Sequence, residues 1–213
     1  LSKNTAPTVL TSLHYLEREE VNADLLIIPT DHKIDNNDIF LDQLSTAISN
    51  LDDQTIFTFG IKPKWEEVAY GYLETMPQSD SKILNVKKFI EKPPLETVKK
   101  MLSKGNFLWN SGISLANQNT LKKCFVEHAN YLLKPTDEAL GNSIEDLGFI
   151  KLNVNAWAKT AAISIDYAIM ENISDLKAVE FSCGWSDMGT WNTVFKELES
   201  DTDDCVVSGS VTN

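Results

Sequence analysis

The feature that most constrains the fold is a short apolar run near the N-terminus, Leu-Leu-Ile-Ile at residues 25–28. Apolar side chains at consecutive positions are typical of a strand that is covered on both faces, as in parallel α/β sheets. Upstream of this run, Val9, Leu13 and Leu16 recur at helical spacing behind polar residues that can cap a helix. The N-terminal part of the chain therefore predicts an amphipathic helix over residues 5–20 and then a buried strand.

Strands and helices alternate along the rest of the chain. Short apolar runs predict further strands at residues 55–60, 70–75, 82–90, 111–116 and 176–181. Periodic apolar residues predict helices at residues 40–48, 94–104, much of 118–160, 165–172 and 190–198. This alternation indicates an α/β domain over residues 1–198, with a mainly parallel sheet and helices on both faces. In such folds ligands bind beyond the carboxyl ends of the strands, so residues that follow strands are candidates for a site.

The charge of the chain excludes several classes of protein. The 213 residues carry a formal net charge of −12, whereas proteins that bind nucleic-acid polymers or anionic membrane surfaces present basic patches. No apolar stretch reaches the roughly 20 residues that a membrane-spanning helix needs. Cys124, Cys183 and Cys205 are odd in number and show no CxxC spacing, which favours reduced thiols. We therefore expect a cytoplasmic protein whose partner is neither a nucleic-acid polymer nor a membrane.

Two acidic residues follow predicted strands at opposite ends of the chain. Asp31 comes after the apolar run near the N-terminus, and Asp187 stands in Gly-Trp-Ser-Asp-Met-Gly after the last strand. Carboxylates on fixed supports are suitable Mg²⁺ ligands, and a cation held by two of them can neutralise a phosphate group under transfer. Asp31 could equally cap a turn or a helix, and the sequence spacing does not show that the two residues meet.

A carboxylate and an ammonium group stand side by side at another predicted strand end. In Phe-Ile-Glu-Lys-Pro, Glu91 could accept hydrogen bonds from sugar hydroxyls, and Lys92 could pair with a phosphate as a point charge. Taken alone, the pair is explained as well by a charged strand end before two prolines.

Two further segments combine polar or aromatic side chains with glycine. Leu-Trp-Asn-Ser-Gly brings an amide, a hydroxyl and an open backbone together at Asn110, Ser111 and Gly112. Tyr70 and Gly71 belong to a flat aromatic segment that suits a sugar ring. Either segment could equally be turn chemistry.

Several common catalytic motifs are absent from the sequence. The three histidines show neither HxxxH nor HExxH spacing, which argues against a zinc site. The sequence contains no GxSxG, GxxxxGK[ST] or GxGxxG motif. A serine-hydrolase elbow, a P-loop and a dinucleotide fingerprint are thus excluded from these residues.

Taken in order, these segments resemble the bacterial mannose-1-phosphate guanylyltransferases, a branch of the sugar nucleotidyltransferase family. The segments that carry the resemblance, from residue 4 to residue 191, are Asn-Thr-Ala-Pro, Pro-Thr-Asp-His, Tyr-Gly-Tyr, Phe-Ile-Glu-Lys-Pro, Leu-Trp-Asn-Ser-Gly, Ser-Ile-Asp-Tyr-Ala-Ile-Met-Glu and Gly-Trp-Ser-Asp-Met-Gly-Thr-Trp. The resemblance implies a Rossmann-like nucleotidyltransferase domain with a mixed sheet. It also implies a reaction in which GTP and mannose 1-phosphate give GDP-mannose and pyrophosphate, with Mg²⁺ as cofactor.

The resemblance assigns roles to individual positions. Asp31 and Asp187 would hold the metal, and Lys92, the third expected catalytic residue, would meet the sugar phosphate. Glu91 and Asn110 would bind mannose hydroxyls, while residues 4–7 would lie near the guanine. The expected substrate-binding residues are Asn4, Thr5, Pro7, Tyr70, Gly71, Glu91, Asn110, Ser111, Gly112 and Asp166, the last of these as support behind the contacting residues.

One departure from the family concerns the nucleotide. The family has a strand followed by a Gly-Gly-x-Gly-Thr-Arg loop and a Lys-Pro-Lys segment that hold the triphosphate, and neither occurs in these 213 residues. We therefore expect the chain alone to turn over GTP poorly while it binds mannose 1-phosphate weakly. We also expect the acidic segment at residues 199–213 to lead from the domain into a C-terminal extension. The sequence leaves a homodimer open.

Other functions stay open on sequence alone. One is a non-catalytic sugar-nucleotide-binding or regulatory paralogue that has lost its phosphate loop. Another is a related nucleotidyltransferase that uses a different sugar 1-phosphate. The two strand-end carboxylates and the Glu91–Lys92 pair favour an enzyme, whereas the missing loop favours the paralogue. An acidic interaction module would leave the order of so many segments to coincidence.

Overall fold

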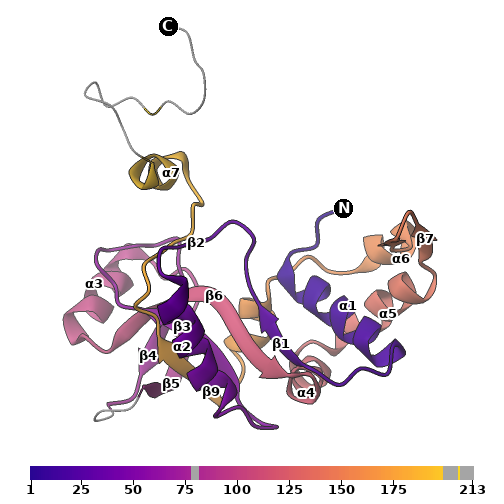
Figure 1. The fold of residues 1–213 in the computed structure, drawn as a ribbon, viewed down its shortest axis with the longest axis horizontal. Coiled ribbons are helices and arrows are strands. Elements are labelled where there is room, and N and C mark those ends of the chain that lie inside the picture. The colour runs from indigo at the N-terminus through magenta and orange to yellow at the C-terminus, as the bar shows by residue number, and fades with distance from the viewer. Residues whose placement is uncertain (78–81, 199–205, 207–213) are drawn as a thin grey trace, which may run out of the picture.

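A six-stranded sheet forms the centre of the molecule (Figure 1). The computed structural model describes residues 1–77, 82–198 and 206. In spatial order the strands are β1 (Asp24–Ile27), β6 (Phe107–Asn117), β3 (Ile56–Ile61), β9 (Leu176–Glu180), β5 (Ile83–Ile90) and β4 (Tyr72–Thr75). Because β4 also pairs with β6, the strands from β6 to β4 form a closed ring of pairings, and β1 adds to this ring beside β6.

Helices cover both faces of the sheet, as the sequence predicts. On one face, α1 (Thr5–Arg18) and α4 (Gln118–His128) share an apolar cluster with Ile56 of β3. On the other face, α2 (Asn37–Ile48) and α3 (Leu95–Lys104) share a cluster with the next residue of that strand, Phe57. The other helical segments are η1 (Asn130–Leu132), α5 (Leu133–Gly141), α6 (Val154–Lys159), the π-helical turn η2 (Asp166–Met170) and α7 (Trp191–Glu197).

Local sequence sets the ends of several helices. The side-chain oxygens of four asparagines accept hydrogen bonds from backbone N–H groups at the starts of α1, α2, α4 and α6; these residues are Asn4, Asn36, Asn117 and Asn153. Gly105 ends α3 with a φ of 75°, the left-handed conformation that glycine adopts without a steric penalty. The sequence predicts this glycine cap correctly.

The sheet is mixed, but the prediction that it is mainly parallel is wrong. β1, β3, β9 and β4 run in one direction, whereas β6 lies between β1 and β3, and β5 between β9 and β4, in the opposite direction. Among the described strands, only β3 and β9 therefore pair in parallel. Alternating strands and helices predict strands of one direction, but they do not reveal that a later strand inserts between two earlier ones.

β1 is less buried than its apolar sequence predicts. Leu25 and Ile27 pack against the cluster on the α1 face and Leu26 against the cluster on the α2 face, so both faces are covered. These residues are nevertheless only partly buried. The reason is that β6 is the only described strand that pairs with β1, and an edge strand keeps one side open.

Two stretches differ from the predicted elements. β6 begins at Phe107, ahead of the predicted start at residue 111, so Asn110 and Gly112 lie within a strand and not at its beginning. Part of the region predicted to be helical forms a hairpin of β7 (Ile144–Asp146) and β8 (Phe149–Lys151). Its turn, Leu147–Gly148, has positive φ at both residues, which favours a two-residue hairpin turn over a helix.

A further ribbon escapes prediction because of its length. β2 (Lys33–Ile34) and β10 (Trp185–Ser186) pair over two residues each, which is too short for a periodic pattern. The predicted exit segment at residues 199–213 lies outside the described residues, apart from position 206.

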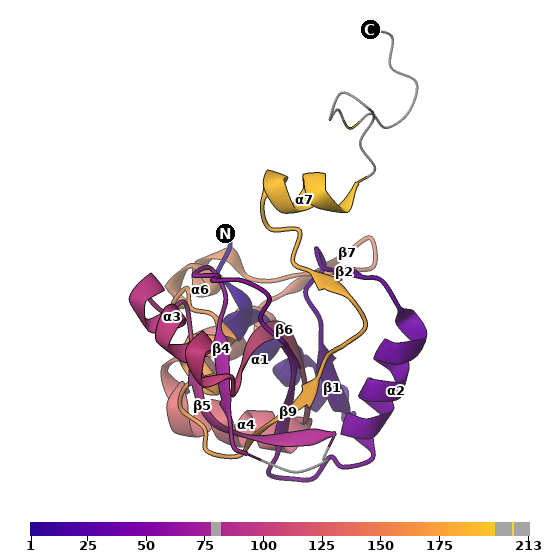
Figure 2. The ribbon, with the colours of Figure 1, turned by 90° about the vertical axis from the view of Figure 1, so that its left-hand side faces the viewer.

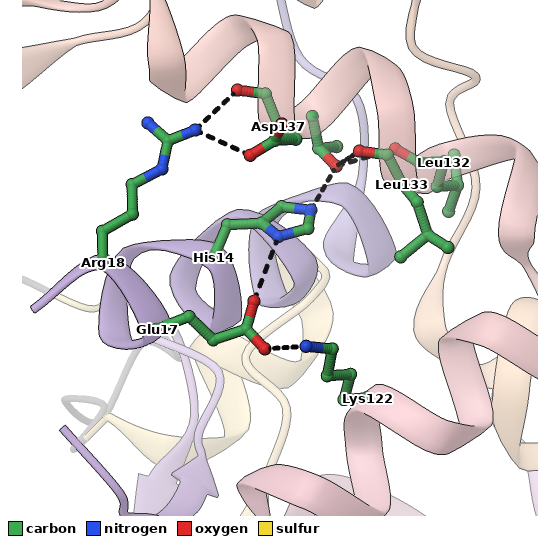
Figure 3. Close-up of polar contacts among 8 residues, drawn as sticks. His14, Glu17, Arg18, Lys122, Leu132, Leu133 and Asp137 are labelled. Atoms are coloured by element: carbon green, nitrogen blue, oxygen red, sulfur yellow. Dashed lines mark hydrogen bonds and ion pairs between the residues drawn. The ribbon is translucent and has the colours of Figure 1, made fainter. Parts of the chain in front are cut away.

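Polar contacts join α1 to α4 and α5 (Figure 3). Nε2 of His14 lies 3.2 Å from Oγ1 of Thr136, a fully buried residue whose hydroxyl donates to the carbonyl of Leu132. Two ion pairs also connect these helices, Glu17 with Lys122 and Arg18 with Asp137. These contacts fix the position of α1, whose N-terminal end reaches the site described below.

Helix α7 stands apart from the body of the molecule, beyond the β2–β10 ribbon (Figure 2). The ammonium group of Lys33 donates a hydrogen bond to Glu197 of α7 and so ties this helix to the ribbon. None of the described helices is long and apolar enough to cross a membrane.

Candidate active site

A pocket lies where two strands leave a gap along the same edge of β6. The last residue of β1, Ile27, is opposite Ser114, and the first residue of β4, Tyr72, is opposite Trp109, while β3 occupies the other edge of β6. The middle of β6, at residues 110–112, borders the gap between β1 and β4. The pocket at this gap has a volume of about 290 Å³. It adjoins the end of β1 as predicted, but also the start of β4 and the interior of β6.

β6 carries a bulge where it passes the pocket. Between the pairs Thr58–Ser114 and Gly60–Asn110, β6 has three residues and β3 has one. Gly112, inside the bulge, has a φ of 74°, and a Cβ atom there would lie 3.3 Å from Cγ of Pro29. Glycine thus supplies both the backbone conformation and the space that the loop after β1 requires.

Most of the residues predicted for the site line this one pocket. They are Thr5, Tyr70, Gly71, Glu91, Lys92, Asn110, Ser111, Gly112, Asp166 and Asp187. Asn4, Pro7 and Asp31 are not among its lining residues. The arrangement is a property of the fold, whereas the roles of these residues stay predictions.

The β2–β10 ribbon brings the regions of Asp31 and Asp187 together. In its antiparallel register Ser186 is opposite Lys33. Asp187, the residue after Ser186, therefore lies near His32, the residue before Lys33, and Asp31 comes next. Oδ1 of Asp31 lies 4.0 Å from Nε2 of His32, and the charges of both aspartates act on this imidazole. Residues that are far apart in the sequence therefore meet beside one side chain.

The two aspartates differ in their surroundings. The Asp31 side chain is 71% exposed, whereas Oδ1 of Asp187 is buried and accepts no hydrogen bond from any described residue. The Asp187 carboxylate faces the phenol of Tyr70. Burial, followed by this carboxylate, holds the pKa of Tyr70 above its ordinary value. A buried carboxylate oxygen that lacks a donor is suited to a cation.

These two carboxylates fit the Mg²⁺ that the resemblance implies. Mg²⁺ is usually held by one or two carboxylates, and substrate phosphates and water complete its coordination. Within the described ranges, no group of three or more His, Cys, Asp or Glu side chains could hold a metal ion. The unpartnered oxygen of Asp187 is thus the observation that supports a magnesium site, and the site itself stays a prediction.

Carboxylates outnumber cations in the part of the pocket around Lys92. Nζ of Lys92 lies 3.4 Å from Oε1 of Glu91, and the backbone N–H of Glu91 donates to Oε1 of Glu171 at 2.9 Å. Burial, and then the charge of Asp166, raises the pKa of Glu91, and burial also raises the pKa of Asp166. Lys92 opposes both shifts. This part of the pocket therefore has fewer positive than negative groups, with Lys92 facing Glu91 and Asp166.

Hydrogen bonds on two sides orient the amide of Asn110. Its Oδ1 accepts a hydrogen bond from the hydroxyl of Thr58 at 2.8 Å, and its Nδ2 donates to Oδ1 of Asp166 at 3.1 Å. Asp166 stands at the start of η2, and such π-helical turns are frequent at functional sites. Asp166 thus orients Asn110 and also lines the pocket, while its role as a supporting residue stays a prediction.

Gly71 makes room for the Glu91 carboxylate. A Cβ atom at this position would lie 2.6 Å from Oε2 of Glu91 and 3.1 Å from Cζ of Phe89. In addition, the backbone carbonyl of Gly71 accepts a hydrogen bond from the N–H of Asn110 at 2.8 Å. The glycine therefore helps to place two of the predicted sugar-binding residues.

The N-terminal residues predicted to lie near guanine have structural roles in the described chain. The Asn4 side chain caps α1, and Pro7 is buried within this helix. The hydroxyl oxygen of Thr5, which does line the pocket, accepts a hydrogen bond from the N–H of Ile165 at 2.9 Å. This bond fixes the start of α1 against the residue next to Asp166.

His32 and Trp185, which the sequence does not single out, also line the pocket. Nε1 of Trp185 donates a hydrogen bond to Nδ1 of His32 at 3.1 Å. Each residue stands within two positions of a predicted metal ligand, and this proximity was the available signal. Their contact depends on the two-residue ribbon, so the sequence could not pair them.

Comparisons with known proteins identify the family to which the chain belongs. Residues 1–204 match the family described as nucleotidyl transferase. A relative from Sinorhizobium fredii (strain NBRC 101917 / NGR234), named mannose-1-phosphate guanylyltransferase, is 34% identical over 211 residues. The alignment covers 99% of this chain but only 41% of that relative, so the chain spans less than half of its length.

Solved structures show the same fold. A crystal structure described as mannose-6-phosphate isomerase from Helicobacter pylori has a TM-score of 0.78 and 26% identity, covering 87% of this chain and 71% of that chain. One described as mannose-1-phosphate geranyltransferase from Thermus thermophilus also has a TM-score of 0.78, with 24% identity and 92% and 55% coverage. The family match over residues 1–204 and the mixed sheet flanked by helices lead to one conclusion, that this chain belongs to the nucleotidyl transferase family.

Proposed function

We propose that this chain is part of an enzyme that transfers a guanylyl group from GTP to mannose 1-phosphate, giving GDP-mannose and pyrophosphate. The observation that carries the proposal is the composition of one pocket. It combines Lys92 and Glu91, which suit a sugar phosphate, with Asp187 and the neighbouring Asp31, which suit a metal-bound phosphate. The name of the Sinorhizobium fredii relative supports the choice of sugar and nucleotide.

The residues around Lys92 would bind the sugar phosphate. The Lys92 ammonium would pair with the phosphate, and the Glu91 carboxylate would accept hydrogen bonds from vicinal hydroxyls of the sugar. Asn110, whose amide is already oriented by Thr58 and Asp166, has one N–H left to donate to a hydroxyl. A pre-oriented amide binds without first losing rotational freedom, which favours a single pose of the sugar ring.

Asp31 and Asp187 would hold Mg²⁺. A divalent ion there supplies positive charge that offsets the charge developing on the phosphate oxygens. The buried, unpartnered Oδ1 of Asp187 supports this assignment.

The chain's own residues would act mainly by positioning. A phosphate oxygen of mannose 1-phosphate attacks the α-phosphorus of GTP in line, a new P–O bond forms, and the bond to the leaving pyrophosphate breaks. No covalent bond to the protein is needed. Lys92 and Glu91 would hold the attacking group, and proximity of this kind contributes several kcal/mol in well-oriented reactions.

The test is a turnover assay on the full-length protein that contains this chain, with Mg²⁺, a panel of nucleoside triphosphates and a panel of sugar 1-phosphates. We expect GDP-mannose and pyrophosphate from GTP and mannose 1-phosphate only. Preference for another sugar 1-phosphate would contradict the proposed substrate and favour a related nucleotidyltransferase. Binding of mannose 1-phosphate by calorimetry without turnover of any pair would instead favour a non-catalytic paralogue.

Glu91→Ala and a matched control test the sugar side of the site. The Glu91→Ala variant should raise the KM for mannose 1-phosphate by about tenfold or more, since tenfold corresponds to ~1.4 kcal/mol of lost binding. Glu96 also lies beside a lysine, Lys99 at 3.3 Å, but its side chain is 80% exposed on α3 and does not line the pocket. Glu96→Ala should leave both kinetic parameters unchanged. An unchanged Glu91→Ala enzyme would remove Glu91 from the site.

A further inference from the structure

The imidazole of His32 is held in one tautomer by the hydrogen bond from Trp185. The indole N–H can only donate, and it approaches Nδ1 of His32 at 3.1 Å, so Nδ1 must act as an acceptor and carry no proton. The neutral ring therefore carries its proton on Nε2. The Trp185 ring packs edge-on against the imidazole at a centroid distance of 5.2 Å, which fixes the orientation of the ring as well.

The Nε2–H group is a donor without an acceptor. No described residue accepts a hydrogen bond from it, and the Asp31 oxygen at 4.0 Å is too distant for one. The imidazole lines the pocket, with 12% of the His32 side chain exposed. Next to the ring, Gly112 leaves space, because a Cβ atom there would lie 3.6 Å from Cε1 of His32.

We propose that Nε2–H of His32 donates a hydrogen bond to a non-bridging oxygen of the phosphoryl group under transfer, and that Trp185 is a positioning residue that keeps this proton on Nε2. The proposal rests on the proposed function, because it needs a phosphate beside Asp31 and Asp187. A phosphate oxygen would be an acceptor for the Nε2–H group of His32. The Asp31 carboxylate, at 4.0 Å, lies beyond hydrogen-bond distance of Nε2, so the oriented donor is free to bind a phosphate oxygen.

Kinetics of His32 variants test the donor. Gln places an amide N–H near the position of Nε2, whereas Asn places its amide near Nδ1 and leaves the Nε2 position empty. We expect His32→Asn to lower kcat by about 100- to 1,000-fold, the range that loss of one oriented donor produces, and His32→Gln to retain most of the activity. Equal losses in both variants, with unchanged thermal stability, would contradict the donor role.

Variants of two tryptophans test the positioning role. Trp185→Phe keeps an aromatic ring but removes the N–H, and it should lower kcat severalfold with little change in the KM for mannose 1-phosphate. Trp157→Phe is the matched control, since Nε1 of Trp157 donates to the carbonyl of Leu1 and does not line this pocket. It should leave kcat unchanged. An unaltered Trp185→Phe enzyme would contradict the role of Trp185.

A spectroscopic measurement separates this proposal from the proposed function. Nitrogen-15 NMR of the histidine rings at neutral pH should show the pure Nε2–H tautomer for His32 in the wild-type chain and a mixture in Trp185→Phe. Addition of GDP-mannose with Mg²⁺, which carries the transferred phosphoryl group, should move the Nε2–H proton resonance downfield. An Nδ1–H tautomer, or no movement at saturating GDP-mannose, would overturn the proposal whatever the turnover assay shows. Conversely, absence of GDP-mannose formation with these signals intact would overturn only the proposed reaction.

Discussion

Gly112 and Gly148 have similar backbone conformations in different surroundings. Their φ angles are 74° and 79°, but a Cβ atom on Gly148 would have no atom within 4 Å, whereas one on Gly112 would press on Pro29 at 3.3 Å. Both alanine variants meet the same backbone penalty, of the order of 1 kcal/mol. Only the Gly112→Ala variant would also displace the loop that carries Asp31 and His32.

We therefore expect Gly148→Ala to lower stability by about 1 kcal/mol with kcat unchanged, and Gly112→Ala to lower kcat/KM at least tenfold as well. Thermal unfolding and steady-state kinetics of the two variants check this. Equal kinetics in both would mean that the space beside Pro29 is not needed for function.

Burial of Asp166 should make stability depend on pH. Its pKa is raised by burial, so the native state keeps this proton to higher pH than the unfolded state. The free energy of unfolding therefore falls as pH rises from the ordinary aspartate pKa through the raised one. The Asp166→Asn variant removes this pH-dependent loss of stability. It also keeps a side-chain oxygen that can accept the hydrogen bond from Asn110.

The Asp166→Asn variant should therefore unfold at a higher Tm than wild type at pH 7, by roughly 2–4 °C if the gain is ~1 kcal/mol in a chain of this size. The difference should shrink as pH falls toward 4. Calorimetric scans over this pH range provide the measurement, and a constant difference would show that the charge of Asp166 is not its cause.

At the scale of elements, the contact between α1 and α5 depends on a buried hydroxyl. The Thr136 hydroxyl donates to the Leu132 carbonyl and lies beside Nε2 of His14 (Figure 3). Thr136→Val keeps the shape but leaves His14 without this partner, which should cost about 1–3 kcal/mol. Lys134→Ala, on the exposed side of the same helix, should change stability by less than ~0.5 kcal/mol. Urea unfolding of both variants tests the contrast, which fails if the two midpoints coincide.

The predictability of the elements follows from the range of the interactions that form them. The α1 pattern, the Gly105 cap and the apolar β3 strand are encoded within a few neighbouring residues, and the sequence predicts them correctly. The antiparallel insertion of β6 between β1 and β3 depends on pairings between distant residues. The two-residue β2–β10 ribbon is likewise decided by tertiary contacts. Local patterns carry no information about either.

The candidate site divides in the same way. The sequence predicts Glu91, Lys92 and Asn110 as pocket residues because they stand in segments that follow or enter strands and that resemble a known family. It cannot predict that Thr58 and Asp166 orient the Asn110 amide, since these side chains come from three separate elements. It also cannot supply the partner of His32, which the ribbon provides.

For the whole molecule, charge should control ligand binding. The chain carries a formal net charge of −12, and Lys92 is the only lysine or arginine among the described residues that line the pocket. A phosphate dianion therefore approaches carboxylates with a single cation to offset them. Mg²⁺ would supply the missing positive charge.

We expect calorimetry to show that mannose 1-phosphate binds at least about tenfold more tightly in millimolar Mg²⁺ than in EDTA. Asp187→Asn should abolish most of this dependence, while Asp24→Asn, an aspartate outside the pocket, should preserve it. Equal affinities of the wild-type chain with and without Mg²⁺ would contradict a metal beside the sugar phosphate.

The position of Asp187 depends on the register of the β2–β10 ribbon, because Asp187 directly follows Ser186, which pairs with Lys33. Side chains alternate between the two faces of a strand, so one inserted or deleted residue between Cys183 and Asp187 would turn the aspartate to the opposite face without unfolding the domain. Selection should then act on the length of this segment more strongly than on its composition. In an alignment of homologues we expect amino-acid changes at position 186 to be tolerated far more often than gaps.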